Sequence, residues 1–454
     1  MVKKIENRGE VLAWSMYDFA NQPFTNIVVT FIYGTFFATV LATDEITGTQ
    51  QWSHAVSITA IVVAILSPLM GALADRGGYR KVFMFLFTWM TILATAALYF
   101  VMPGEVFKAL FWFVLANIGF EMGAVFCNAY LPDISHSKNI GRISGYGWSL
   151  GYVGGLIALA LAMFFLVQPD VPVFGFAKGE IGAYENIRAT NLLVAIWFAL
   201  FSIPTFIFLK DRKPDKKALV KNMKSTLTDF KTTAKELRQY PQIIRFLIAR
   251  LVYNDGLVTI FAFGGIYAAG TLNFTFDEIM LMGIVLNVTA GIGSFLMGFL
   301  DDWVGGRMTI KVTLIGLMLA IFLAVIAPEV VPWLQYVFGG TAVPDGLNAK
   351  NIFWVAAVLI GIFSGPNQAS SRSLMGRFTP ESKKNEFFGF FAFSGKATAF
   401  VGPLLLGILT VLFDSQRAGI LIIFFFFLAG YILLHRVDEQ KGMLQGGYVD
   451  EIDV

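Results

Sequence analysis

Among the ionisable residues inside the long apolar stretches of this 454-residue chain, five could carry chemistry: Asp18, Glu121, Arg250, Asp255 and Lys396. If those stretches cross a membrane, an ionised Asp, Lys or Arg costs about 2.5–3.5 kcal/mol on insertion scales, so each needs a partner or a water-filled cavity. A carboxyl group in such a place can take up and release a proton, and an arginine can bind a carboxylate with both arms of its guanidinium. The pattern indicates proton movement together with binding of a small charged solute.

Glu121 is the first candidate for a proton carrier and Asp18 is the second. Glu121 lies about 21 Å from the start of its stretch near residue 107, at 1.5 Å per residue, and Asn117 shares its helix face. Asp18 shares a face with three residues at helical spacing: Trp14, Tyr17 and Asn21. We expect Tyr17, Asn21 and Asn117 to contact the solute. The alternatives are a fixed hydrogen bond between helices for Glu121 and a gate pair with a basic residue for Asp18.

A second polar group lies in the later part of the chain, where Arg250, Asn254 and Asp255 share one stretch. Arg250 and Asp255 are five positions apart, about 140° around a helix, so they do not pair closely with each other. Asp255 could instead pair with Lys396, near the middle of another stretch; a structural ion pair is the alternative to solute binding. Two uncharged residues, Asn367 and Gln368, complete the predicted solute site. Their alternative role is hydrogen bonding between helices.

The composition excludes an ordinary soluble protein. Hydrophobic residues make up 56% of the chain and charged residues only 14%, whereas a soluble domain has about 25% charged residues. A net charge of +3 is too small for a nucleic-acid-binding face. One cysteine (Cys127) and three scattered histidines make no disulfide and no metal cluster. Because the sequence also has no phosphate-binding loop and no nucleophile elbow, we expect no enzyme activity, no cofactor and no metal.

Twelve segments are apolar and long enough to cross a bilayer, which takes about 20 residues. They are too long for barrel strands, so we expect an all-α, polytopic membrane protein with two six-helix repeats. The twelve segments lie near residues 11–42, 52–75, 80–102, 107–130, 144–167, 190–210, 243–270, 278–303, 308–327, 350–376, 385–412 and 417–436. Pro23 is expected to kink the first of them.

Lysine and arginine set the expected orientation. With the N-terminus inside, the inner segments hold 26 Lys and Arg residues and the outer ones 5, and three more lie within spans. The excess on one side predicts that both termini are cytoplasmic. The expected organisation is a six-helix half at 1–210, a linker at 211–242, a second half at 243–436 and a tail at 437–454. The basic linker carries an apolar stripe at helical spacing, and we expect it to bind anionic lipid; a plain solvated tether is the alternative.

The two halves contain a repeated loop. The loop after the second span and the loop after the eighth match at an offset of 227, with four pairs in register: Gly71 and Gly298, Asp75 and Asp302, Gly78 and Gly305, Arg80 and Arg307. Gly allows a helix end to approach its neighbour closely, and an Asp can accept N–H groups at the start of an adjacent helix. We expect these loops to act as releasable latches. A weaker internal repeat relates Gly145 and Gly151 to Gly389 and Gly395. It indicates a face where small residues let helices pack closely.

Twelve spans, a central basic loop and the paired loops resemble the major facilitator superfamily. The specific part is the signature between spans 2 and 3, with Gly78-Tyr79 as a one-residue insertion. This sequence matches it at six positions: Gly71, Asp75, Arg76, Gly77, Arg80 and Lys81. The second copy departs from it, because Trp303 follows the aspartate in place of arginine. The resemblance implies two halves that rock about a central cavity, and it implies a monomer.

A narrower resemblance is to the autophagy-related vacuolar effluxer-like subgroup. It rests on the run from Ala13 to Asn21, the run from Gly365 to Ser373 and the run from Glu386 to Lys396. Fungal members of this subgroup are associated with amino-acid export from the vacuole. The resemblance therefore implies a carrier, and both charge signs among the buried residues favour an amino acid or similar zwitterion as its cargo. Short loops and the lack of an organelle-targeting signal favour a bacterial inner membrane.

Two other functions fit the sequence less well. The high aromatic content would suit an exporter of drugs or siderophores, although lipid contact demands the same residues. A receptor with a carrier fold and no flux is the third hypothesis, and the short loops and missing soluble domain speak against it.

Overall fold

The computed structural model describes residues 7–211, 237–337 and 348–447. Within these ranges every regular element is a helix, and twelve helices are long and apolar enough to cross a membrane. The prediction of an all-helical protein with twelve spans is confirmed. Most of the predicted linker, residues 212–236, lies outside the described ranges, and its predicted helix and lipid contact stay predictions.

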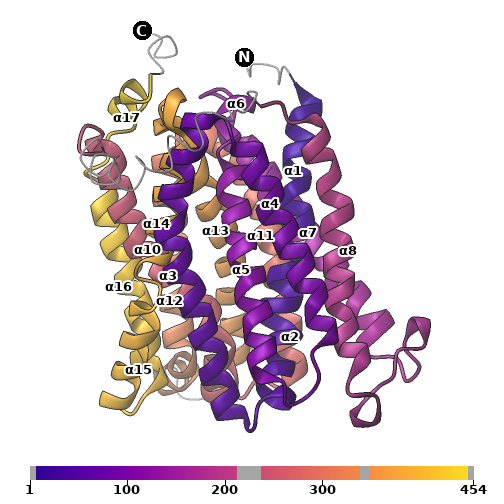
Figure 1. Ribbon diagram of the computed structural model, residues 1–454. Helices are drawn as coiled ribbons and strands as arrows, with labels where there is room; N and C mark the ends of the chain where they lie inside the picture. Colours follow the sequence, from indigo (N-terminus) through magenta and orange to yellow (C-terminus); the bar gives the residue numbers. More distant parts are fainter. Residues whose placement is uncertain (1–6, 212–236, 338–347, 448–454) are drawn as a thin grey trace. The chain divides into compact units, whose positions relative to one another are not determined.

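The first compact unit consists of residues 1–136, 150–235 and 379–393. Within it α1 packs beside α8, α3 beside α5, and α4 beside both α5 and α8 (Figure 1). Its helices are α1 (Arg8–Pro23), η1 (Phe24–Phe31), α2 (Tyr33–Phe36), η2 (Phe37–Leu41), α3 (Glu45–Gly77), α4 (Arg80–Ala97), η3 (Leu98–Phe100), α5 (Val106–Asn128), α6 (Leu131–Ile134), most of α7 (Ile140–Ala162), η4 (Met163–Val167), η5 (Val173–Gly175), η6 (Glu180–Gly182), α8 (Glu185–Phe208), η7 (Glu381–Lys383) and most of α14 (Lys384–Lys396).

The second compact unit consists of residues 137–149, 236–378 and 394–454. Within it α13 packs beside α11 and α12, and α16 packs beside α10 and α12. Besides the first turns of α7 and the end of α14, its helices are α10 (Pro241–Leu272), α11 (Phe276–Val304), α12 (Gly306–Val337), α13 (Ala349–Phe378), α15 (Val401–Leu412), α16 (Gln416–Leu434) and α17 (Glu439–Gln445).

The first span changes its helical register at Pro23, where a kink was expected. The α-helix ends there, and the next eight residues, Phe24–Phe31, form a π-helix. Proline has no N–H group for the carbonyl four residues earlier. That carbonyl, on Phe19, accepts a hydrogen bond from the indole of Trp197 on α8 (3.1 Å). A side chain from a neighbouring helix thus compensates for the bond that Pro23 removes.

The eleventh span is interrupted, which the sequence analysis missed. The α-helical pattern stops at Lys396 and resumes at Val401, and the intervening residues form turns. Two hydrogen bonds of the tighter i→i+3 kind close these turns, from the Ala399 N–H to Lys396 O (3.3 Å) and from the Val401 N–H to Thr398 O (2.7 Å). Non-helical backbone at membrane depth is tolerated only where protein buries it or where it lines a cavity.

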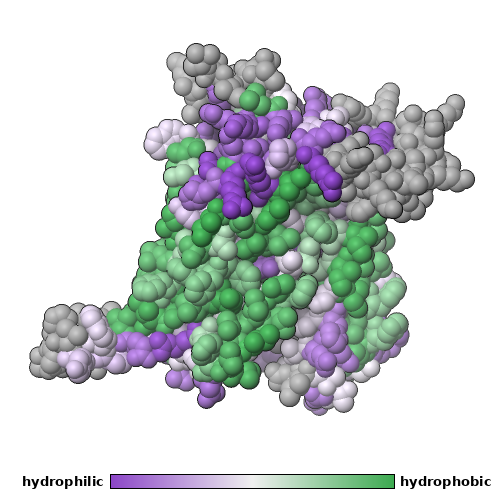
Figure 2. Space-filling model, turned by 90° about the vertical axis from the view of Figure 1, so that its left-hand side faces the viewer, coloured by the Kyte–Doolittle hydropathy of each residue, from purple (hydrophilic) through white to green (hydrophobic). Residues whose placement is uncertain are grey.

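The sides of the helices carry the apolar surface that a lipid-facing protein needs. Large hydrophobic side chains such as Ile61 on α3, Leu200 on α8 and Ile315 on α12 are exposed. Figure 2 shows hydrophobic residues over the flanks of the helices and hydrophilic residues toward their ends. Exposed apolar area of this extent is unusual for a soluble monomer and is expected in contact with lipid tails.

Candidate functional site

Asp75 caps the start of α14. Its carboxylate accepts the backbone N–H groups of Asn385 (3.1 Å) and Glu386 (2.8 Å) and the side-chain amide of Asn385 (2.7 Å). N–H groups in the first turn of a helix have no acceptor within that helix, and they carry its partial positive charge. One turn earlier on α3, a Cβ at Gly71 would lie 2.3 Å from the Asn385 carbonyl oxygen. Glycine at position 71 is therefore what lets α3 reach α14.

The second unit repeats this arrangement. Asp302, at the end of α11, accepts the backbone N–H groups of Gly141 (2.8 Å) and Arg142 (3.3 Å) at the start of α7. A Cβ at Gly298 would lie 2.8 Å from Cα of Arg142. Both copies of the loop thus place a glycine and an aspartate against the first turn of another helix, as expected from the repeat. Their function as gates stays a prediction.

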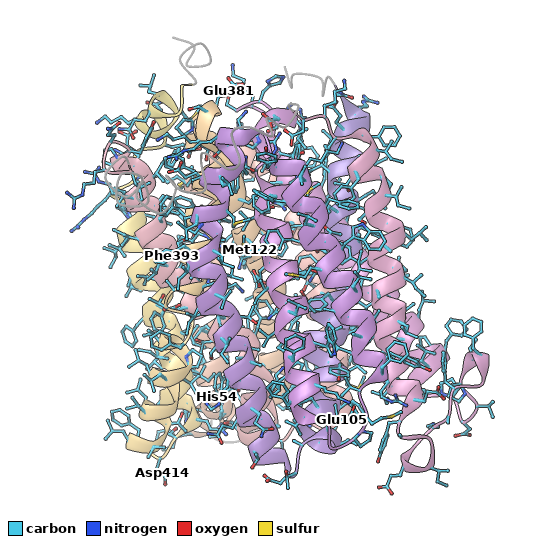
Figure 3. The ribbon with its side chains drawn as sticks, viewed as in Figure 1. His54, Glu105, Met122, Glu381, Phe393 and Asp414 are labelled. Atoms are coloured by element: carbon cyan, nitrogen blue, oxygen red, sulfur yellow. The ribbon has the colours of Figure 1, made fainter. Side chains whose placement is uncertain are left out.

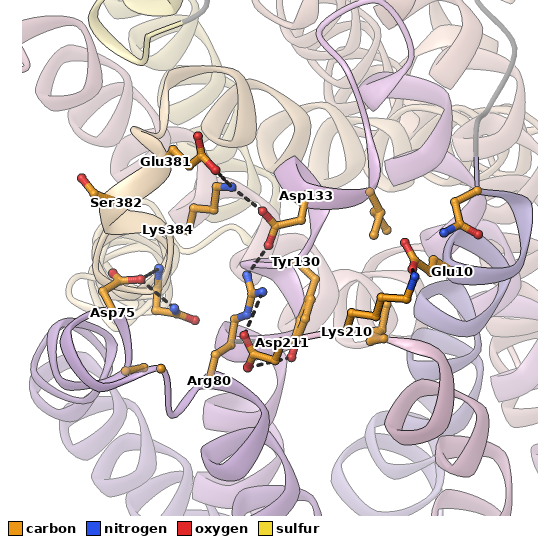
Figure 4. A pocket seen from close by; sticks show the side chains of 16 residues that line it. Glu10, Asp75, Arg80, Tyr130, Asp133, Lys210, Asp211, Glu381, Ser382 and Lys384 are labelled. Carbon is orange, nitrogen blue, oxygen red and sulfur yellow. Dashed lines mark hydrogen bonds and ion pairs between the residues drawn. The ribbon is translucent and has the colours of Figure 1, made fainter. Parts of the chain in front are cut away.

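Arg80 is the centre of a charged cluster in the first unit. Its guanidinium lies 3.5 Å from the ring centroid of Tyr130, 2.5 Å from the Asp133 carboxylate and 3.4 Å from that of Asp211. Asp133 also binds Lys384, at the start of α14. Figure 4 shows Arg80 between the two aspartates, with Lys384 beyond Asp133. The cluster lines a pocket of about 510 Å³.

The linker begins at this cluster. Asp211 accepts the backbone N–H of Lys81 (2.8 Å) and the hydroxyl of Tyr130 (3.1 Å), and the Lys81 ammonium donates to Leu209 O (2.6 Å). Arg76, the other basic residue of the signature, is exposed. Asp133 and Asp211 were missed by the sequence analysis, because single acids just past an apolar stretch look like ordinary loop residues. Their only signal is that both closely follow spans expected to end on the same side as the loop.

In the second unit Arg377 supplies the charge that the repeat lacks. Trp303 is largely exposed, whereas Arg377 of α13 is buried, 2.5 Å from Asp301, 3.9 Å from Asp302 and 3.4 Å from Glu439. Glu439 also accepts the backbone N–H groups that begin α12, those of Gly306 (3.0 Å) and Arg307 (2.9 Å). Burial raises the pKa of the Glu439 carboxyl above its ordinary value, and the neighbouring Arg377 counteracts that rise. The Arg307 side chain binds Leu434 O and His435 O (both 3.0 Å).

The aromatic residues of the N-terminal motif hold α1 in place. The Trp14 indole donates to Cys127 O (2.8 Å) on α5, and the Tyr17 hydroxyl pairs with that of Thr88 (2.8 Å) on α4. Both rings are buried. Tyr17 was expected to contact solute, and its placement favours a packing role.

Asp18 and Asn21 lie on the same helix, Asp18 half-buried and Asn21 buried. A Cβ at Gly151 of α7 would lie 3.3 Å from Asp18 O, and one at Gly154 would lie 2.3 Å from Phe19 O. These approaches form part of the expected small-residue face.

Glu121 lies on α5, near the middle of the span Val106–Ile134. Its neighbour Met122 is labelled in Figure 3, between Glu381 at one end of the first unit and Glu105 at the other. The Glu121 side chain is half-buried, and Asn117, one turn earlier, is buried. The structure thus places the leading proton-carrier candidate at mid-span.

Three predicted residues of α10 converge on the interrupted span. Arg250 donates to the Ser394 hydroxyl (2.8 Å), Asn254 donates to Gly395 O (2.9 Å), and Asp255 accepts from the Thr398 hydroxyl (3.1 Å). Lys396 lies within the same stretch and is half-buried. The expected pairing of Asp255 with Lys396 is replaced by this bond from Thr398.

The remaining predicted residues lie on α13. The Asn367 amide donates to the Thr313 hydroxyl on α12 (2.9 Å) and is fully buried, which favours helix–helix packing. Gln368 is half-buried. Among the described residues, no cluster of His, Cys, Asp and Glu could hold a metal ion.

Comparison with known proteins adds the family. The family model described as "Vacuole effluxer Atg22 like" matches residues 52–447. The uncharacterized MFS-type transporter YxiO of Bacillus subtilis is 27% identical over 436 residues, which cover 94% of each chain. Autophagy-related protein 22 of Cryptococcus neoformans is 27% identical over 317 residues, 67% of this chain and 54% of the relative. The chain thus spans about half the length of that fungal protein.

Solved structures share the fold. The proton:xylose symporter XylE aligns over 96% of both chains with a TM-score of 0.70 and 11% identity. The E. coli fucose:proton symporter FucP aligns over 96% of this chain and 100% of its own, with a TM-score of 0.69 and 13% identity. At these identities the likeness concerns the fold alone. The family match, which covers most of the chain, shows that this protein belongs to the Atg22-like family and is a membrane transporter of the major facilitator type.

Proposed function

We propose that this protein is a secondary active transporter that moves a small polar solute by alternating access. The observation that carries the proposal is the pair of aspartate caps: Asp75 on the start of α14, and Asp302 on the start of α7. Each cap joins helices far apart in the chain through a few charge-assisted hydrogen bonds, which a modest free-energy change can break and remake. One latch of this kind in each compact unit fits a cycle in which the cytoplasmic side opens and closes.

The cargo we favour is an amino acid or a similar zwitterion. Arg250 and Lys396 supply positive charge, Asp255 supplies negative charge, and Asn254 supplies an amide, all close to the interrupted eleventh span. A zwitterion needs both signs of charge within a few ångströms of each other, which a drug-binding apolar cavity does not provide. The description of the matching family, vacuole effluxer, agrees with a solute carrier, and the direction of transport in this protein is left to experiment.

Protons are the coupling ion that we propose, with Glu121 as the leading carrier and Asp18 as the second. Both lie within the first unit's apolar spans, where a charge change has a large effect on the free energy of a conformation. We further place both termini in the cytoplasm and the protein in a bacterial inner membrane, from the distribution of Lys and Arg residues.

Uptake into proteoliposomes tests the proposal. The purified protein is reconstituted and offered a mixture of labelled amino acids, with and without an imposed pH gradient, and the lumen is read by mass spectrometry. We expect gradient-dependent accumulation of one class of amino acid. If a control carrier accumulates its own cargo in matched vesicles while this protein moves no amino acid, then amino acids are excluded. Movement of unrelated hydrophobic cations in the same vesicles would then favour an exporter of drugs.

A further inference from the structure

The interruption of the eleventh span has a cause in its own sequence and contacts from its neighbour. Residues 397–400 read Ala-Thr-Ala-Phe, and Gly402 and Pro403 follow them. Pro403 has no N–H group for the carbonyl of Ala399, four residues earlier, so a continuous helix cannot form there. The bonds from Arg250 to Ser394 and from Asn254 to Gly395 O fasten the end of α14 to α10. Pro403 thus favours the break, and these contacts fix where the helix before it ends.

The restart of the helix is packed directly onto Asp255. A Cβ at Gly402 would lie 2.1 Å from the Thr259 hydroxyl and 2.9 Å from the carbonyl oxygen of Asp255. Only glycine lets α15 begin at this distance. The carboxylate of Asp255 lies beside the unwound turns, because the Thr398 hydroxyl in those turns donates a hydrogen bond to it.

The Asp255 carboxylate is buried, and its hydrogen-bond partner is a neutral hydroxyl group. It is the fifteenth residue of α10, about 21 Å along the helix, and only 3% of its surface is exposed. In the part of the chain that the structure describes, its carboxylate accepts one hydrogen bond, from the Thr398 hydroxyl, and forms no ion pair. An ionised carboxylate at such depth needs a positive charge beside it. No described residue forms an ion pair with this carboxylate, although Arg250 and Lys396 lie near the same interrupted span.

The surroundings suit a single positive charge. The last carbonyl groups of α14 carry the partial negative charge of a helix C-terminus, and Thr398 follows that end of the helix by two residues. Unwound carbonyls and half-helix C-terminal ends are ligands that transporters use for cations. Arg250 and Lys396 bring positive charge to the same stretch, which disfavours a divalent ion.

We propose that Asp255, Thr398 and the end of α14 form a binding site for one monovalent cationic group. Its source is either the ammonium of the cargo or a free sodium ion, which share the same oxygen ligands. The proposal rests on the transporter function above and assigns the cation to one carboxylate. Asp255 binds the cationic group, and Arg250 then binds the carboxylate of the cargo.

The test measures binding without flux. The purified full-length protein is heated in detergent while the fluorescence of its nine tryptophans reports the Tm. Sodium chloride and methylammonium chloride are titrated against choline chloride at equal ionic strength. A cation that binds the folded protein raises the Tm saturably. The variants are Asp255→Asn, Thr398→Val and the matched control Asp414→Asn, an exposed residue at φ +45° where asparagine is well tolerated.

We expect a saturable rise in Tm in the unmodified protein and in Asp414→Asn, and none in Asp255→Asn. Thr398→Val should shift the midpoint of the titration about 3- to 10-fold upward, because one neutral oxygen ligand is lost. A response to sodium alone identifies a free ion, and a response to methylammonium identifies the cargo's ammonium. If Asp255→Asn does not fold, the shift in Thr398→Val decides.

Three results would overturn the site: no saturable response to either salt, an equal response in Asp255→Asn, or a Tm that follows only pH. Because the measurement needs no transport, it separates the two proposals. If the protein binds the cation but moves no solute, the proposed site stands and the proposed transporter function is refuted.

Discussion

Replacing Asp75 by Asn removes the charge at the start of α14 and keeps the size of the side chain. The two backbone N–H groups donate to different oxygens of the carboxylate, and asparagine has only one acceptor oxygen. One hydrogen bond to a charged group, worth about 1.5–3 kcal/mol, is therefore lost, and the other weakens by roughly 1 kcal/mol. The lost attraction between charge and helix start adds about 0.5–1 kcal/mol. With tenfold for each 1.4 kcal/mol, the population in which α14 has left α3 should rise about 100-fold or more.

A buried cysteine can report that separation. Ser67 of α3 is fully buried, and its hydroxyl donates to Gly389 O of α14 (3.0 Å). In a Cys127→Ala background, which removes the single native cysteine, Ser67→Cys should react with a charged maleimide only when the helices part. We expect Asp75→Asn to raise the reaction rate by one to two orders of magnitude.

The matched control is Asp170→Asn, whose side chain is fully exposed in a loop of the first unit. It makes the same change of charge without touching α14. A rate in Asp75→Asn within twofold of the parent would refute the capping argument. An equal rise in Asp170→Asn would trace the effect to general loosening and would refute it as well.

Three further substitutions test the rest of the account. Glu121→Gln should abolish gradient-driven uptake and spare exchange, and an unchanged pH dependence of uptake would remove Glu121 from the mechanism. Gly71→Ala places a methyl group 2.3 Å from a carbonyl oxygen of α14 and should lower stability by about 1–3 kcal/mol in a thermal melt, whereas Gly407→Ala, with open space around its Cβ, should not. Arg377→Met leaves the fully buried Asp301 without its ion pair, at a cost of about 3–5 kcal/mol. Adding Asp301→Asn should restore much of the Tm, and no recovery would contradict the pairing.

The spans were predictable because each is a local apolar run. The same holds for Pro23, whose missing N–H acts on its own helix. The interruption at 397–400 was missed although Pro403 marks it, because proline lacks the N–H that the carbonyl of Ala399 would need. Only the contacts from α10 leave no local signal. Length and hydropathy therefore locate a span without revealing whether it is continuous.

For each aspartate cap, the sequence predicted the aspartate but not the helix start that it binds. The repeat identified Asp75 and Asp302 as residues that bind a helix start, but no sequence pattern named Asn385 or Gly141 as the start that each would meet. Tyr17 illustrates the opposite limit. Helical spacing correctly put it on one face with Asp18, yet spacing cannot tell a face that packs on α4 from one that meets solute.

The compensation by Arg377 was hidden for a further reason. The second loop lacks the arginine of the first, and the guanidinium that pairs with Asp301 comes from α13, 76 positions away in the chain. A charge supplied from a distant helix leaves no trace in the spacing of a motif.

The central claim, proton-coupled movement of a solute, is tested most directly by recording both fluxes at once. Proteoliposomes filled with a pH-sensitive dye receive the accumulated amino acid with no imposed gradient, and solute and proton entry are followed together. The account predicts that adding the solute moves protons in a fixed ratio, and that Glu121→Gln stops the proton signal while exchange continues. Solute movement with no change in internal pH would contradict it.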